Sequence, residues 1–180
     1  MNDRRFSRIR RIRLISRMMK ALAYFAVAAF AVLYLVAFTS PEGVAAVVHT
    51  VAGRGFPATL GNADLAVVFL IGAVPFTLFL AAVFTAGRLF GAFQKGCILD
   101  PIAGALLCRI GTLVLLSEVA GVLAQAAATA YMSMQSGTGS GTVTISTTNL
   151  AGILLGVVIL VAGWAIGEAA EVAEDNRQFV

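Results

Sequence analysis

The chain has 180 residues, of which 59% are hydrophobic and only 12% charged, and its formal net charge is +4. Soluble domains average about 45–50% apolar and about 25% charged residues, so this composition excludes a soluble globular domain. Two cysteines exclude a disulfide scaffold, and 18 glycines without a repeating period exclude a fibre. The composition therefore predicts an all-α integral membrane protein.

Four apolar stretches are long enough to form transmembrane helices, which need about 20 apolar residues to cross a hydrocarbon layer of ~30 Å. The predicted spans cover approximately residues 21–38, 65–86, 102–130 and 150–166. Pro75 lies in the middle of the second span, where its missing N–H is expected to kink the helix. The third stretch exceeds the thickness of the hydrocarbon, so its first turns are expected in the interface, with Arg109 extending its side chain to the near surface.

The distribution of basic residues predicts the orientation, because cytoplasmic flanks of membrane spans are enriched in Lys and Arg. With both termini in the cytoplasm, 12 of the 13 Lys and Arg residues lie inside and only Arg54 lies outside. The chain then divides into a basic cytoplasmic leader (1–20), a four-helix transmembrane domain (21–166) and an acidic cytoplasmic tail (167–180). A cleaved signal peptide is the competing interpretation, but its apolar core of about 7–15 residues is shorter than the first span.

The basic leader carries a stripe of cations at helical spacing. Its members are Arg10, Arg13, Arg17 and Lys20. Further arginines lie on the other side of the predicted helix, so the segment is basic almost all round. We interpret it as an anchor on anionic lipid headgroups, where each basic residue contributes about 1 kcal/mol. A cytoplasmic arm that binds nucleic acid or a protein partner is the other interpretation, and direct nucleic-acid binding is not expected.

Glu118 is the only acidic residue inside a predicted span. A carboxylate at the centre of a membrane costs about 2.5–3.5 kcal/mol, so the side chain is expected to face the helix bundle or water. Gln125 and Thr129 follow at +7 and +11, which places them within about 20° of Glu118 on a helical wheel. These three residues form a polar seam, which indicates either a proton or ligand site or a hydrogen bond between helices. No basic residue lies deep in another predicted span, which favours the hydrogen bond.

Four glycines in the fourth span share one face of the helix. They are Gly152, Gly156, Gly163 and Gly167. Their spacing contains two GxxxG units, which let the backbone of a neighbouring helix approach closely. Packing within the chain is the default interpretation, and a seam between two copies of the chain is the other.

The sequence contains no recognisable catalytic or cofactor motif. No phosphate-binding glycine loop, nucleophile elbow or HExxH motif occurs. Cys97 and Cys108 fall on the predicted cytoplasmic side and His49 on the other, so they cannot form a zinc site of ordinary ligand number. We therefore expect no enzyme activity, no cofactor and no metal.

The segment between spans two and three combines several local signals. Leu89, Phe90 and Phe93 form the apolar face of a short amphipathic cytoplasmic extension, and Asp100-Pro101 predicts the N-cap and first position of the next helix. The chain carries Leu89-Phe90, Lys95-Gly96, Asp100-Pro101 and Arg109-Ile110-Gly111, and its terminal residues are EDNRQFV. With these features it resembles the bacterial membrane family called domain of unknown function 2975. The resemblance implies a multi-pass protein of the bacterial inner membrane, in a family without an agreed activity whose genes often neighbour a small helix-turn-helix regulator.

Two functions from different classes follow from these observations. The first is a non-enzymatic scaffold or regulatory protein whose leader, loop 87–101 and tail bind a cytoplasmic protein, with a helix-turn-helix regulator as one candidate and a homo-oligomer as another. The second is a small transporter or proton-linked permease that uses Glu118, Gln125 and Thr129. The concentration of charge on the inside favours the first, and the lack of an obvious inverted repeat weighs against the second.

Overall fold

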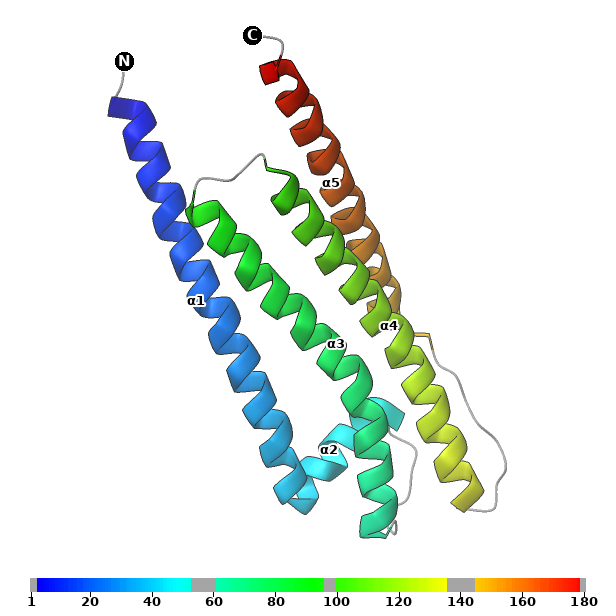
Figure 1. Ribbon diagram of the computed structural model, residues 1–180. Coiled ribbons are helices and arrows are strands. Elements are labelled where there is room, and N and C mark those ends of the chain that lie inside the picture. The colour runs from blue at the N-terminus through cyan, green and yellow to red at the C-terminus, as the bar shows by residue number, and fades with distance from the viewer. Residues whose placement is uncertain (1–2, 53–60, 96–99, 136–144, 179–180) are drawn as a thin grey trace. The chain divides into compact units, whose positions relative to one another are not determined.

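The computed structural model describes residues 3–52, 61–95, 100–135 and 145–178. The described chain consists of five helices (Figure 1). They are α1 (Asp3–Thr39), α2 (Pro41–Ala52), α3 (Asn62–Gln94), α4 (Pro101–Gln135) and α5 (Thr147–Gln178). α1, α3, α4 and α5 are each long and apolar enough to cross a membrane. The prediction of four membrane-length helices is confirmed, while the orientation of the termini stays a prediction.

Local side-chain caps explain where three of the helices begin. Asp100 Oδ1 accepts a hydrogen bond from the backbone N–H of Ile102 at 3.0 Å, which confirms the predicted N-cap of α4. At the start of α2, Ser40 Oγ accepts from the N–H of Gly43 at 3.1 Å. At α5, Ser146 Oγ accepts from the N–H of Asn149, whose side chain in turn accepts from the N–H of Ser146, so each residue satisfies a free backbone donor of the other.

Helix α2 is the element that the sequence analysis missed. Its apolar stretch, Glu42–Val51, is ten residues long, too short to span a membrane, so the sequence predicts only a connection between the first two spans here. Val44 and Val48, one turn apart, are 8% and 5% exposed, and they form a core cluster with Val68, Ala128 and Met132. The helix is therefore held by one apolar face and packs on α3 and α4.

The described helices form two compact units, to each of which α1, α3, α4 and α5 all contribute. Unit 1 comprises Met1–Ala28, Ala81–Leu113 and Leu154–Val180, and unit 2 comprises Ala29–Leu80 and Val114–Ile153, including α2. The buried core cluster lies in unit 2.

Large apolar side chains on the outer faces of the helices have no protein to pack against. Trp164 is 77% exposed, Phe25 72% and Leu35 66%. In water such a surface would be an aggregation liability, whereas lipid tails cover it without cost. The fold thus places the protein in the class of multi-pass helical membrane proteins.

Candidate functional site: a cavity and two helix contacts

Glu118 joins α4 to the first turn of α5. Its Oε2 accepts a hydrogen bond from Asn149 Nδ2 at 3.3 Å. One turn further along α5, Gly152 leaves the space that the carboxylate occupies, since a Cβ at that position would overlap Glu118 Oε1. The acid therefore has a neutral hydrogen-bonding partner on a neighbouring helix.

The other two residues of the predicted polar seam lie in different surroundings. The Thr129 hydroxyl is 1% exposed and donates within its own helix, with the carbonyl oxygens of Gln125 and Ala126 at 2.9 Å and 3.0 Å. The Gln125 side chain instead lines a cavity that does not include Glu118 or Thr129 in its wall. The structure thus places the three residues on α4 but does not bring their functional groups into one site.

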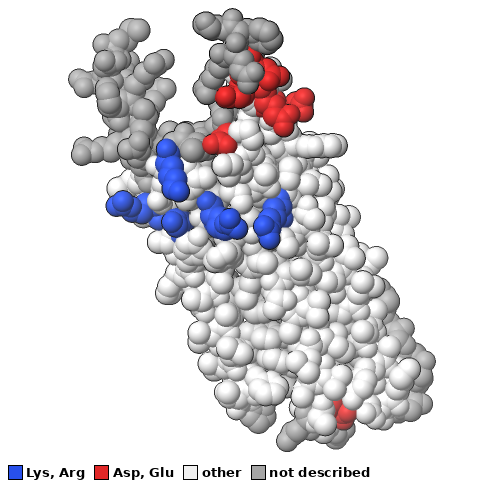
Figure 2. All heavy atoms as spheres, viewed as in Figure 1, with Lys and Arg blue, Asp and Glu red and all other residues white. Residues whose placement is uncertain are grey.

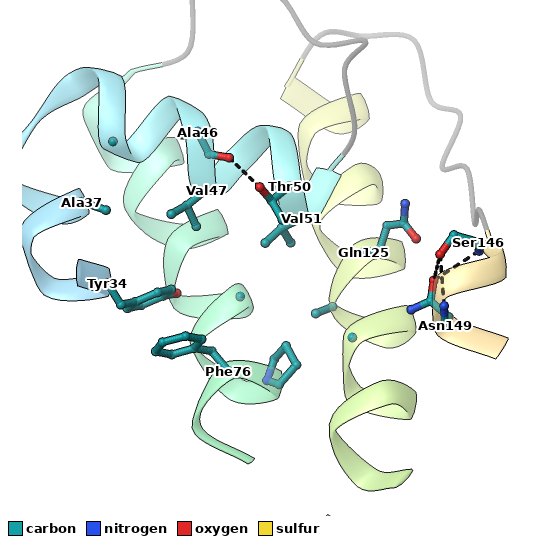
Figure 3. Close-up of a pocket in the computed structure, with 15 residues that line it drawn as sticks. Tyr34, Ala37, Ala46, Val47, Thr50, Val51, Phe76, Gln125, Ser146 and Asn149 are labelled. Atoms are coloured by element: carbon teal, nitrogen blue, oxygen red, sulfur yellow. Dashed lines mark hydrogen bonds between the residues drawn. The ribbon is translucent and has the colours of Figure 1, made fainter. Parts of the chain in front are cut away.

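The cavity has a volume of about 660 Å³ and lies within unit 2 (Figure 3). Most of its wall is apolar, with polar groups from α2, α4 and the start of α5. The lining residues are Tyr34, Ala37, Gly43, Ala46, Val47, Thr50, Val51, Gly72, Pro75, Phe76, Gly121, Ala124, Gln125, Ser146 and Asn149. Sequence reasoning missed the cavity because its lining comes from all five helices.

An aromatic pair forms one side of the cavity. The rings of Tyr34 from α1 and Phe76 from α3 stack with centroids 4.4 Å apart and an interplanar angle of 16°. The Tyr34 hydroxyl donates to the backbone carbonyl of Phe69 at 2.7 Å, which fixes the ring against α3. In Figure 3 both rings lie on the opposite side of the cavity from Gln125 and Asn149. This side of the cavity is therefore an aromatic wall whose tyrosine ring is held in place by a hydrogen bond.

A second polar cluster of unit 2 ties α3 to α4. Asp64 Oδ1 accepts hydrogen bonds from the Tyr131 hydroxyl at 2.8 Å and from Gln135 Nε2 at 2.9 Å. The sequence offered a weak signal for it, namely an acid in the first turn of α3 and two polar residues one turn apart on α4. These bonds anchor the start of α3 beside the core under α2, where Tyr131 packs.

Unit 1 contains a close contact between α4 and α5 made by glycines from both helices. A Cβ at Gly104 would lie 2.7 Å from the Cα of Gly167, and a Cβ at Gly111 would lie 2.6 Å from the backbone N of Leu160. Gly163 faces Cys108, and Gly156 is buried with its carbonyl 2.8 Å from the position of a Gly111 Cβ. The structure thus places the predicted glycine face of α5 against α4 of the same chain.

Cys108 lies at the centre of this contact. Its Sγ donates to the backbone carbonyl of Leu160 at 3.7 Å, across the space that Gly163 leaves open. The glycine spacing of α5 predicts this face from the sequence, whereas nothing in the sequence marks the α4 glycines or the thiol as its counterparts.

The described Lys and Arg side chains all belong to unit 1, and Figure 2 shows them gathered in a band, with acidic side chains of the α5 end beyond it. The described cations are Arg17, Lys20, Arg88, Lys95 and Arg109. Lys20 Nζ lies 5.9 Å from the centroid of the Tyr24 ring, within range of a cation–π contact. The side chains of Arg10 and Arg13, predicted to belong to the basic anchor, lie outside the described residues.

Within the described residues, no group of three or more His, Cys, Asp or Glu side chains is arranged to hold a metal ion. Comparison of the chain with family models, with curated proteins and with solved structures finds no match. The resemblance to the family named above therefore stays a prediction.

Proposed function

We propose that the protein is a non-enzymatic multi-pass protein of the bacterial inner membrane that acts as a scaffold or regulator by binding a cytoplasmic protein. The segregation of charge carries this proposal: every described Lys and Arg belongs to unit 1, and the enrichment of basic residues at cytoplasmic flanks supports a cytoplasmic location for this charged region. α5 continues beyond the glycine contact as a helix to Gln178. Residues 171–175 of this end are exposed.

The exposed end of α5 has the chemistry of a protein-binding helix. Residues 171–175 are all exposed, and the apolar side chain of Val172 is 53% exposed among acidic neighbours. Glu168, Glu171, Glu174 and Asp175 supply the negative charge. An acidic helix of this kind complements a basic protein surface, because matched potentials speed association and set specificity.

The permease alternative needs an ionisable group where a solute or proton could reach it. Glu118, the acid on which that function depends, is bonded to Asn149, and the cavity wall does not include it. The geometry therefore favours the interaction function.

We expect a cysteine at position 145 to be labelled from outside intact cells and one at position 171 only after permeabilisation. Ile145 is 70% exposed in unit 2 and Glu171 is exposed in unit 1, so both replacements present an accessible thiol. Ile145→Cys and Glu171→Cys would be compared in a chain lacking Cys97 and Cys108, with a membrane-impermeant maleimide. Labelling of position 171 from outside would contradict the proposed orientation.

A photo-crosslinking amino acid at Val172 is expected to yield a discrete protein adduct in cells. The matched control is the same amino acid at Trp164, a more exposed position that lies within the fourth span predicted from the sequence (150–166). Neutralising the tail with Glu168→Gln, Glu171→Gln, Glu174→Gln and Asp175→Asn should remove the adduct while the chain still accumulates in the membrane. An adduct of equal yield in the neutralised variant, or none at Val172, would overturn the proposal.

A further inference from the structure

We propose that the cavity of unit 2 binds an uncharged amphiphile from the membrane, a molecule with an apolar body and a small head that both donates and accepts hydrogen bonds. Its volume of about 660 Å³ falls within the range of about 300–1,000 Å³ that is typical of small-molecule sites. This site is independent of the acidic end of α5 and extends the function proposed above.

The wall of the cavity selects against a charged ligand. None of its lining residues is acidic or basic, so a charged head would lie in an apolar setting without a counter-ion. Glu118, the nearest acid along α4, already accepts the hydrogen bond of Asn149. A neutral head is therefore the one that the cavity can hold without a large desolvation cost.

Most polar groups of the wall are already engaged within the protein. The Tyr34 hydroxyl donates to Phe69, and the Thr50 hydroxyl donates to the carbonyl of Ala46 at 2.8 Å. Asn149 and Ser146 bond to one another. These groups fix the shape of the wall and leave little hydrogen-bonding capacity for a ligand.

Gln125 differs from them, because its carboxamide has no hydrogen-bond partner among the described residues and lines the cavity from α4 (Figure 3). An amide in an apolar setting offers two donors and one acceptor. A hydroxyl head placed beside it would satisfy both kinds of group, because a hydroxyl both donates and accepts. The apolar body of the ligand would then lie along the aromatic wall of Tyr34 and Phe76.

Glycines leave open space that side chains could have filled. A Cβ at Gly121 would meet nothing closer than the Cβ of Pro75 at 4.0 Å. Open space of this size beside the Gln125 amide has room for a ligand. Three of the residues that line the cavity, Ala46, Thr50 and Ser146, are also exposed at the protein surface. The cavity therefore opens to the surface.

The test uses the full chain in nanodiscs and a monoacylglycerol that carries a diazirine in its acyl chain, with labelled peptides mapped after irradiation. We expect adducts on cavity residues of unit 2, saturable by unlabelled monoacylglycerol. A free fatty acid with the same diazirine chain, ionised at pH 8, should label at least about tenfold less, because its carboxylate lacks a partner. Equal labelling by both probes, or labelling that does not saturate, would overturn the proposal.

Gly121→Leu is the decisive variant, since it fills the cavity from a position where the added side chain has room. It should reduce saturable labelling by about tenfold or more, because added apolar atoms in a binding pocket exclude the ligand atoms that would lie there. Gly167→Leu is the matched control, because a Cβ at Gly167 also meets nothing within 4 Å but lies in unit 1. Unchanged labelling of folded Gly121→Leu would show that the probe binds elsewhere.

Gln125→Leu provides a second readout that does not depend on filling the cavity. It keeps the approximate size of the side chain and removes the amide, so labelling should fall about fivefold, as expected for one lost hydrogen bond. Equal labelling of Gln125→Leu and the unaltered chain would exclude the amide as the head-binding group and overturn the proposal.

Discussion

Gly163→Ala is expected to lower the free energy of unfolding by about 1–3 kcal/mol, the usual cost of an extra methyl group in a close-packed contact. The new Cβ would lie 2.5 Å from the backbone N of Cys108, and 2.9 Å from its Sγ and from the Cβ of Leu107. A backbone atom cannot rotate away as a side chain can, so α4 and α5 would have to separate along the whole contact. Denaturation of the purified protein in mild detergent measures the change.

Gly167→Ala is the control for this prediction, because it is the same substitution on the same helix with open space around the new methyl group. Since alanine is favoured over glycine in a helix, its stability should stay equal or rise by up to about 1 kcal/mol. If the glycine face instead joined two copies of the chain, Gly163→Ala would change the oligomeric state and leave the unfolding of the monomer unaffected. That outcome would contradict the contact within the chain.

Glu118→Leu is expected to be the most damaging change in the polar part of unit 2, while Glu118→Gln should be nearly silent. Leucine leaves the Nδ2 group of Asn149 without its acceptor, at a cost of about 1–3 kcal/mol. Glutamine keeps a carbonyl oxygen at the same reach and therefore keeps the bond. Because Asn149 also caps the start of α5, the loss should appear as fraying there, which hydrogen exchange of residues 147–153 would detect.

The contrast between the two Glu118 variants separates a structural acid from a proton carrier. Asn149→Ala should destabilise at least as much as Glu118→Leu, since it removes this hydrogen bond and also the one that Asn149 Oδ1 accepts from the N–H of Ser146. If Glu118→Gln were as harmful as Glu118→Leu, an ionisable group would be required at this position, and the permease function would regain support.

The four long helices could be predicted because each depends on a local property, the length of an apolar run. The same reasoning failed for α2, whose stability comes from packing Val44 and Val48 on α3 and α4 rather than from its own length. The signals at its start, Ser40 as a cap and Pro41 in the first turn, were present but do not distinguish a short helix from a turn.

The polar seam on α4 shows why a shared helical face does not make a shared site. From Glu118 to Thr129 the helix rises by about 16 Å, so the element opposite changes along its length. Glu118 faces α5, where it bonds to Asn149, and Gln125 faces the cavity. The Thr129 hydroxyl donates to the carbonyl of Gln125 in its own helix. Angles on a helical wheel can be taken from the sequence, but the partner at each level cannot.

The position of the Cys108 thiol makes the packing of α4 against α5 accessible to cysteine chemistry. Cys108 is half-buried, and its Sγ lies 2.9 Å from the position of a Cβ at Gly163. A reagent that alkylates Sγ adds atoms beside this contact, so the rate of its reaction relative to a free thiol should rise when α4 and α5 separate. A single native sulfur can therefore report on the packing of two helices without a label being introduced.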